Sequence, residues 1–404
     1  MALAEPNTQS APTRADIVVG VAASQGGPAA TSTADTVEAE ISRCFPSRTG
    51  EVVLLSNETS SDGAATSPTA THPAVFTGGF LGTESALPAL LQAAQSLDAN
   101  ACALVGDQAR SPGDNWLRLL LEPIVEQGYD FVCPAYQRHP LAGTINTGIV
   151  YPLTRALFGK RLRQPMGGEL AMSRKLMDHL LRDEEWQSDP VYAGADIWLV
   201  TKVLSREFRV CQSFIGPRPD AAGGTAEDLS ETLARVVGLL FHEMERHAAV
   251  WQRTIGSEAV PTFGVSAAPE GEAPPANIAR MIDRFELGLR ELQAFWAMII
   301  APADMLALQR TNGRPSGPFR FDDGLWARVL YDFALGYHAG LASRNQILRA
   351  MTPLYLGWVA GFLNEVQNLS AVQIEERIER VCLAFESNKP YLISRWRWPD
   401  RFSP

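Results

Sequence analysis

The chain has 404 residues, and its 45 acidic against 35 basic side chains give a formal net charge of −10 at pH 7. Hydrophobic residues make up 46% of it, which is enough for a sizeable core and excludes a chain that is disordered throughout. The acidic balance and the lack of any basic run exclude nucleic acid as the main partner, because phosphate contacts need clustered Lys and Arg.

Neither a signal peptide nor a membrane span is predicted. The first residues carry no basic start and no apolar core, and no stretch approaches the roughly 18 apolar residues that a span needs. We therefore expect a cytoplasmic protein.

Five cysteines are scattered along the chain without any C-x-x-C pair, so the sequence predicts neither a zinc cage nor a disulfide framework. Those in apolar runs should be buried and act as small hydrophobic side chains. The five are Cys44, Cys102, Cys133, Cys211 and Cys382.

Short apolar strands alternate with helices through the first part of the chain, which is typical of a mainly parallel sheet covered on both faces. Ligands of such sheets bind beyond the carboxyl ends of the strands, so we expect a site where loops begin near Ala22, Ser56, Val105 and Pro134. The predicted strands are 16–22, 51–56, 101–105, 130–134 and 208–215, and the predicted helices are 33–45, 85–97, 116–126, 169–182, 196–206 and 227–251.

Residues 266–276 read SAAPEGEAPPA, the composition of a linker. Everything beyond the linker has helical spacing, in segments 278–300, 323–340, 344–365 and 371–386, with Pro390 as the breaker that follows the last helix. The predicted organisation is a disordered tail (1–14), an α/β domain (15–265), the linker and an α-helical C-terminal domain (277–404).

Several strong motifs are missing. No G-x-G-x-x-G follows the first strand and no Walker sequence occurs, so neither common phosphate-cradling loop is predicted. The chain also lacks G-x-S-x-G and H-E-x-x-H, which removes the motifs of esterases and zinc peptidases.

Positive charge concentrates in one segment of this acidic chain. Two interpretations stay open for it, binding of a phosphate or carboxylate, or a solvated basic helix face. The residues are Arg138, His139, Arg155, Lys160, Arg161 and Arg163.

Two carboxylates stand out. Glu169 follows two glycines that would let a ligand approach the backbone, so it either binds sugar hydroxyls or complements the start of the predicted helix. Asp196 lies among apolar neighbours at a helix start and is either a cap or a polar group in a pocket.

The stretch from Asp16 to about Ile215 resembles a GT-A glycosyltransferase of the family-2 type, similar to bacterial enzymes related to glucosylglycerate and mannosylglycerate synthases. The tail resembles the helical tail of the same group. The matching segments are 16–21, 59–63, 85–87, 146–159, 163–169, 194–198, 351–357 and 389–392.

This resemblance implies a GT-A, Rossmann-like α/β mixed sheet with an all-α C-terminal region. It also implies a divalent metal, Mg²⁺ or Mn²⁺, held by a D-x-D motif after the third strand. At that place the chain reads Gly106-Asp107-Gln108, so the motif is degenerate and the metal is absent unless Asp107 and Asp220 hold it.

Other site residues are implied by the resemblance in the same way. Glu169 and Asp196 would contact the sugar in the catalytic centre. The nucleotide sugar would contact Ala22, Asn57, Asp62, Asp107 and Gln108, and the acceptor would contact Arg138, Thr144 and Arg163.

Two functions of different classes follow. The first is an enzyme that transfers a hexose from a nucleoside diphosphate sugar to a small hydroxy acid such as glycerate, with retention of configuration. The second is a catalytically degenerate relative with a binding or regulatory role, paired through its C-terminal helices as a homodimer or with an active paralogue.

Overall fold

The computed structural model of the protein describes most of the chain. The described residues are 14–23, 28–56, 74–76, 86–106, 115–137, 143–183, 195–217, 229–265, 276–311 and 318–397.

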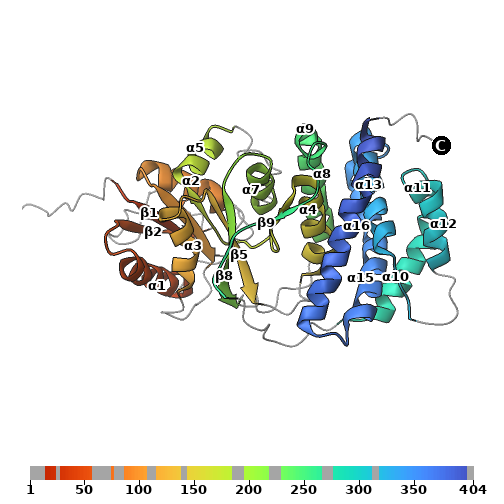
Figure 1. The fold of residues 1–404 in the computed structure, drawn as a ribbon, viewed down its shortest axis with the longest axis horizontal. Coiled ribbons are helices and arrows are strands. Elements are labelled where there is room, and N and C mark those ends of the chain that lie inside the picture. The colour runs from red at the N-terminus through yellow and green to blue at the C-terminus, as the bar shows by residue number, and fades with distance from the viewer. Residues whose placement is uncertain are drawn as a thin grey trace, which may run out of the picture.

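A mixed eight-stranded sheet organises the N-terminal part of the molecule (Figure 1). Its strand order is β10-β8-β5-β7-β4-β1-β2-β3, and every neighbouring pair is parallel except those of β7, which runs antiparallel to both β4 and β5. The strands are β1 (Ile17–Ala23), β2 (Gly50–Ser56), β3 (Ala74–Phe76), β4 (Ala101–Gly106), β5 (Phe131–Gln137), β7 (Leu170–Ser173), β8 (Val210–Pro217) and β10 (Thr262–Phe263). A separate parallel ladder joins β6 (Lys160–Arg161) to β9 (Glu258–Ala259).

Helices cover both faces of this sheet because side chains alternate along each strand. In β1, for example, Val19 packs into the cluster with α1 and α3, whereas Val18 packs into the cluster with α2, α5 and α7. The helices of this part are α1 (Pro28–Cys44), α2 (Leu87–Ser96), α3 (Trp116–Val125), the π-helical turn η2 (Asn146–Val150), α4 (Tyr151–Phe158), α5 (Arg174–Leu181), α7 (Ala195–Leu204), α8 (Leu229–Arg246) and α9 (Ala248–Trp251).

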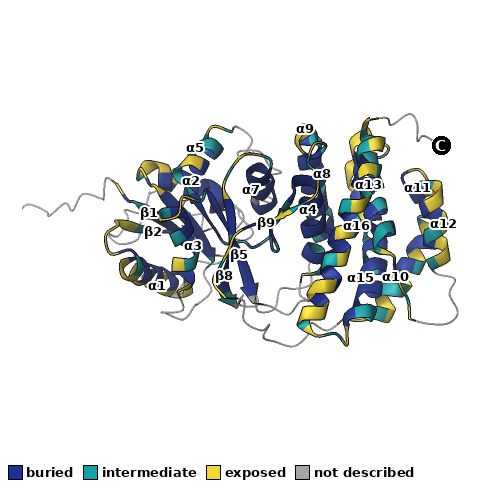
Figure 2. Ribbon diagram, in the orientation of Figure 1, coloured by how far each residue is buried: buried dark blue, intermediate teal, exposed yellow. Residues whose placement is uncertain are grey.

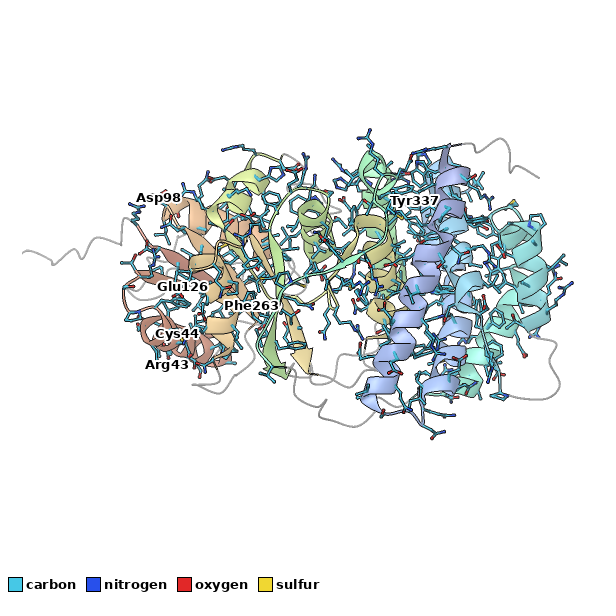
Figure 3. All side chains as sticks on the ribbon, viewed as in Figure 1. Arg43, Cys44, Asp98, Glu126, Phe263 and Tyr337 are labelled. Atoms are coloured by element: carbon cyan, nitrogen blue, oxygen red, sulfur yellow. The ribbon has the colours of Figure 1, made fainter. Side chains whose placement is uncertain are left out.

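The C-terminal part is all helical in its described residues and lies against α4 and α8 (Figure 1). Its buried side chains join the same hydrophobic cluster as the second face of the sheet, so one continuous core runs through both parts (Figures 2 and 3). The helices are α10 (Ile278–Glu291), α11 (Gln293–Ala297), α12 (Pro302–Thr311), α13 (Asp323–Ala339), α14 (Arg344–Ala350), α15 (Thr352–Val366) and α16 (Ala371–Arg397).

The predicted fold class is confirmed: a mixed α/β sheet is followed by an all-α C-terminal region. None of the helices in the described ranges combines the length and the hydrophobicity of a membrane-crossing segment. Cys102, Cys133 and Cys211 are buried free thiols, as expected, and Cys382 is buried too. Burial raises the pKa of Cys211 to about 12.

Two predicted elements are wrong. The helix expected over 169–182 is a strand followed by a helix, since β7 ends at Ser173 and Ser173 caps α5 by accepting a hydrogen bond from the Leu176 N–H. Pro390 does not end the last helix, because α16 runs through it to Arg397. Proline removes one helical hydrogen bond there, and the burial of Leu392 offsets that loss.

Asp130 ties three strands together at the edge of the sheet opposite the carboxyl ends. Its carboxylate accepts hydrogen bonds from the Ser173 hydroxyl at 3.0 Å, the Lys175 ammonium at 2.9 Å and the Arg209 backbone N–H at 2.9 Å. Burial alone would raise the pKa of Asp130, but these donors outweigh it and hold the pKa below its usual value.

We expect Asp130→Asn to lower the free energy of unfolding by about 1–3 kcal/mol at neutral pH, because the hydrogen bonds lose their charge. Because the pKa of Asp130 is lower in the folded state, its ionised carboxylate stabilises the fold fully above the unfolded pKa near 3.9. This stabilisation is lost as the pH falls from that value through the folded pKa. Urea titrations from pH 7 to pH 3 should therefore show the two proteins converging in acid, and a difference that stays constant with pH would contradict this role.

Candidate functional site

The carboxyl ends of the parallel strands lie at one edge of the sheet, where ligands of such folds bind. Because β7 is antiparallel, it begins at this edge, and Glu169 directly precedes it. The Gly106 backbone N–H, at the end of β4, donates a hydrogen bond to Glu169 Oε1 at 3.4 Å. Glu169 thus lies beside the end of β4, and Asp107 is the next residue after that strand in the sequence.

Tyr136 near the end of β5 contacts the same carboxylate. Its hydroxyl lies 3.0 Å from Glu169 Oε2 and 3.0 Å from the Gly167 carbonyl oxygen, and it can donate to either. The sequence analysis missed Tyr136. The available signal was a polar aromatic residue at the carboxyl end of a buried strand.

Asp196 and Glu169, 27 positions apart in sequence, both belong to the residues around one crevice of about 10 Å³, together with Gly167 and Gly168. Asp196 is 8% exposed, in the first turn of α7, and its Oδ1 accepts a hydrogen bond from the Ile197 N–H at 2.8 Å. Asp196 was predicted to be either a cap or a polar group in a pocket, and these two alternatives are not exclusive. The residue lies at a helix start, which favours negative charge, and it also lines a crevice. The structure thus places both residues that the sequence singled out around one crevice.

The helix-complementing alternative for Glu169 is wrong, because Glu169 precedes a strand and the nearest helix, α5, begins five residues later at Arg174. Its carboxylate contacts Gly106 and Tyr136 at the sheet edge instead.

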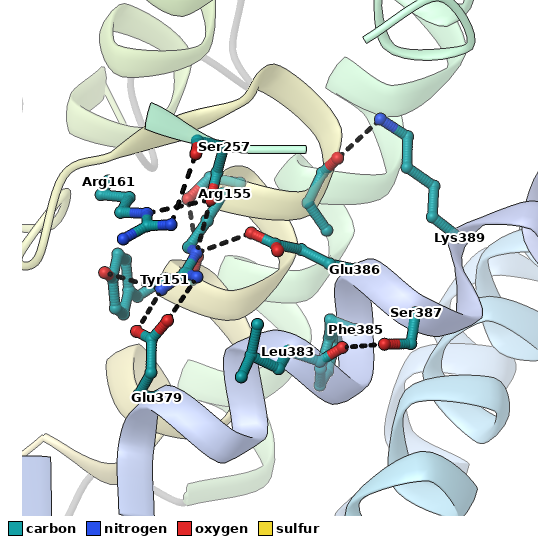
Figure 4. A network of polar contacts seen from close by, with 12 residues as sticks. Tyr151, Arg155, Arg161, Ser257, Glu379, Leu383, Phe385, Glu386, Ser387 and Lys389 are labelled. Atoms are coloured by element: carbon teal, nitrogen blue, oxygen red, sulfur yellow. Dashed lines mark hydrogen bonds and ion pairs between the residues drawn. The ribbon is translucent and has the colours of Figure 1, made fainter. Parts of the chain in front are cut away.

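Arg155 of the basic cluster is 0% exposed, so the solvated-face interpretation is wrong for it. Its side chain points toward two glutamates of α16 (Figure 4). Its guanidinium donates to both oxygens of Glu379 at 2.5 and 2.7 Å and to Glu386 Oε1 at 2.7 Å, both on α16. Burial alone would lower the pKa of Arg155, but these two carboxylates outweigh it and raise the pKa. Arg155 therefore joins the two parts of the molecule.

The other described cations are also paired. Lys160 forms an ion pair with Glu258, and Arg161 donates to the Ser257 hydroxyl at 3.1 Å. Arg163 donates two hydrogen bonds to the Glu375 carboxylate, at 2.9 and 3.0 Å. An acceptor-binding role for Arg163 stays a prediction, and in it the acceptor's anion would compete with Glu375.

Thr144, the second residue predicted to contact the acceptor, bonds to the C-terminal helices. Its Oγ1 lies 2.6 Å from the hydroxyl of Tyr355 on α15. Trp326 on α13 donates to the Gly148 carbonyl oxygen at 2.8 Å, and Trp358 packs so closely on Gly148 that a Cβ there would lie 2.1 Å from its ring. The aromatic side chains of α13 and α15 thus fix η2, which follows Thr144.

The remaining predicted site residues divide into two groups. Ala22 is buried near the end of β1, paired with Gly106 in the sheet. Six others lie outside the described residues: Asn57, Asp62, Asp107, Gln108, Arg138 and Asp220.

Within the part of the chain that the structure describes, no group of three or more His, Cys, Asp and Glu side chains gathers to hold a metal ion. At the end of β4, the Glu169 carboxylate accepts a hydrogen bond from the Gly106 N–H. Carboxylate oxygens are the ligands that Mg²⁺ and Mn²⁺ prefer, so the chemistry of the edge fits such an ion.

Comparison with known proteins gives structural likeness only. No family model matches the chain, and no curated protein matches it. Among solved structures, the chain is similar to glucosyl-3-phosphoglycerate synthase from Mycobacterium tuberculosis in complex with Mn²⁺, UDP-glucose and phosphoglyceric acid, with 18% identity and a TM-score of 0.40 over 63% of this chain and 90% of that one.

Two further structures are similar to the same degree. The same synthase in complex with Mg²⁺ and UDP matches with 18% identity and a TM-score of 0.41, over 63% of this chain and 90% of that one. A crystal structure of a mycobacterial protein matches with 20% identity and a TM-score of 0.38, over 58% of this chain and 75% of that one.

Proposed function

We propose that this protein transfers a hexosyl group from a nucleoside diphosphate sugar to a small hydroxy acid, glycerate or a phosphorylated relative of it. The observation that carries the proposal is the pair of carboxylates, Glu169 and Asp196, on one crevice at the carboxyl edge of the sheet. Two acids at this edge suit the binding of sugar hydroxyls, because a carboxylate accepts short, charge-assisted hydrogen bonds.

In this proposal the acceptor lies on the side of Thr144 and Arg163, between the sheet and the C-terminal helices. The nucleotide lies over the ends of β1, β2 and β4, where Ala22, Asn57, Asp62 and Gln108 would contact it.

Asp107 and Asp220 would hold the divalent metal. The strand order limits how they could share one ion, because the strands that precede them are not neighbours. Asp107 follows β4 and Asp220 lies three residues after β8, and β5 and β7 separate these strands. Three strand spacings amount to about 14 Å, whereas three extended residues reach only about 10 Å. A shared ion therefore requires the segment after Pro217 to run back along the edge toward β4.

The test is a transfer assay on the purified full chain with UDP-glucose or GDP-glucose as the donor, glycerate or 3-phosphoglycerate as the acceptor, and Mg²⁺ or Mn²⁺. We expect slow release of nucleoside diphosphate that depends on the acceptor. Asp107→Ala should lower turnover at least tenfold, because one charged oxygen ligand of the metal is lost. Release that persists unchanged in Asp107→Ala would remove the metal role of Asp107.

A second candidate is a degenerate relative that binds a nucleotide or sugar without transferring it. The observation that favours it is the sequence Gly106-Asp107-Gln108, in which glycine and a neutral amide stand where the motif of the resembled family has acids. This candidate predicts that UDP or GDP shifts the melting temperature while no donor and acceptor pair gives turnover, a combination that would exclude the enzyme.

A further inference from the structure

Tyr136 lies at an irregularity of the sheet. Ala135 pairs with Phe214 and Gln137 with Pro217, so two residues of β8 face Tyr136 alone. The bulge is therefore in β8, and Tyr136 lies opposite it. A bulge leaves backbone groups outside the strand ladder and redirects the side chain, and bulges are common beside active sites.

Both backbone groups of Tyr136 bond to one side chain. Gln164 Oε1 accepts a hydrogen bond from the Tyr136 N–H at 3.3 Å, and Gln164 Nε2 donates to the Tyr136 carbonyl oxygen at 3.0 Å. The amide of Gln164 therefore substitutes for a neighbouring strand at this one residue, and it is 9% exposed. This pairing fixes the backbone of Tyr136 despite the bulge.

The ring of Tyr136 is fixed as well, being 4% exposed and packed in the cluster with α1 and α3. Its hydroxyl then reaches the Gly167 carbonyl oxygen and Glu169 Oε2. Gly167 lies directly on Pro134 of β5, where a Cβ would come within 2.4 Å of the proline ring, so the segment around it has little room to shift.

We infer that Tyr136 is a positioning residue for Glu169. Held by Gln164, it fixes the Glu169 carboxylate between the ends of β4 and β5, and the catalytic consequence rests on the function proposed above. A glutamate side chain that is already ordered loses less conformational entropy when it binds a sugar, and its orientation is set before the donor arrives.

The test compares Tyr136→Phe with Glu169→Ala and the double variant. The matched control is Tyr129→Phe, which removes a phenolic hydroxyl near the opposite end of the same strand, where the ring packs on Phe263. Two readouts are needed: hydrogen exchange of the Gly106 amide in the ligand-free full chain, and steady-state transfer kinetics.

We expect Tyr136→Phe and Glu169→Ala each to speed hydrogen exchange of the Gly106 amide several-fold. The double variant should exchange no faster than Glu169→Ala alone, because Tyr136 acts through Glu169. In steady-state kinetics, Tyr136→Phe should lower kcat about tenfold, because one hydrogen bond to a charged group is lost. The donor KM should change less than threefold, since Glu169 is not among the residues proposed to contact the nucleotide.

Unchanged exchange at Gly106 in Tyr136→Phe would overturn the inference whether or not the protein is a transferase. Additive effects in the double variant would also overturn it, because they would make Tyr136 a general stabiliser. If the exchange results are as expected but the wild type transfers no sugar, the proposed function fails and the positioning of Glu169 stands. A wild type that transfers sugar at a rate unaffected by Tyr136→Phe would contradict a role in the reaction.

Discussion

Replacing Arg155 by alanine should lower the free energy of unfolding by about 3–5 kcal/mol, the cost of removing one partner from a buried ion-pair network. Arg155 is 0% exposed on α4, and three of its nitrogens bond to Glu379 and Glu386 on α16 (Figure 4). Its removal leaves Glu386, whose side chain is 17% exposed, without this cation in a poorly hydrated place. The loss falls on the contact between the sheet and the C-terminal helices.

Arg155→Lys should recover only part of this stability, because a single ammonium cannot replace the fork that serves Glu379 and Glu386 together. The control is Arg118→Ala, which removes an exposed pair with Glu122 within α3 and should cost less than about 0.5 kcal/mol. Chemical unfolding followed by circular dichroism measures all three. A cost for Arg155→Ala as small as that of the control would show that the buried network contributes little.

Lys389 strengthens the same contact. Its ammonium donates to the carbonyl oxygens of Ala156 at 2.6 Å and Thr254 at 2.8 Å, and so caps the end of α4 from α16. Burial lowers the pKa of Lys389 to about 8. This folded pKa lies below the unfolded value of about 10.4. Deprotonation of Lys389 therefore makes folding more favourable as the pH rises from about 8 to 10.

The elements that the sequence predicted best are those decided by local pattern. The apolar runs of β1 and β4 are fully buried between two layers of helices, and such runs read as strands without any knowledge of their neighbours. Strand β7 has only four residues and leads directly into α5, so its apolar side chains also fit the spacing of the helix that follows. Only its pairing with β4 and β5 makes it a strand.

The site was predictable to the extent that it depends on residue type. Glu169 and Asp196 stand out because carboxylates are uncommon among glycines and apolar residues. The role of Tyr136 depends on Gln164 and Glu169, about 30 residues away, and the partners of Arg155 lie 224 and 231 residues away, so no local pattern could reveal either. The carboxylates that pair with Arg155 and Arg163 of the basic cluster lie on α16, so the local sequence could not show that these cations are paired.

Asp196→Asn should lower turnover by about 100-fold or more in the proposed transfer reaction, with the fold intact. The change keeps the size of the side chain and its place in the first turn of α7, but removes the charge. A charge-assisted hydrogen bond to a sugar hydroxyl that strengthens as the transition state forms contributes about 2.7–4 kcal/mol, similar to the loss of one preorganised oxyanion donor.

The matched control is Asp178→Asn, which removes a carboxylate from an exposed pair with Arg174 on α5, away from the crevice. It should leave turnover unchanged within a factor of two. Melting temperatures of both variants separate a loss of fold from a loss of chemistry, because a defect in binding sugar leaves Asp196→Asn as stable as the control. Glu169→Gln should resemble Asp196→Asn if both acids serve the same sugar. If Glu169→Gln alone reduced turnover, Asp196 would be a helix-start residue whose place on the crevice has no part in transfer.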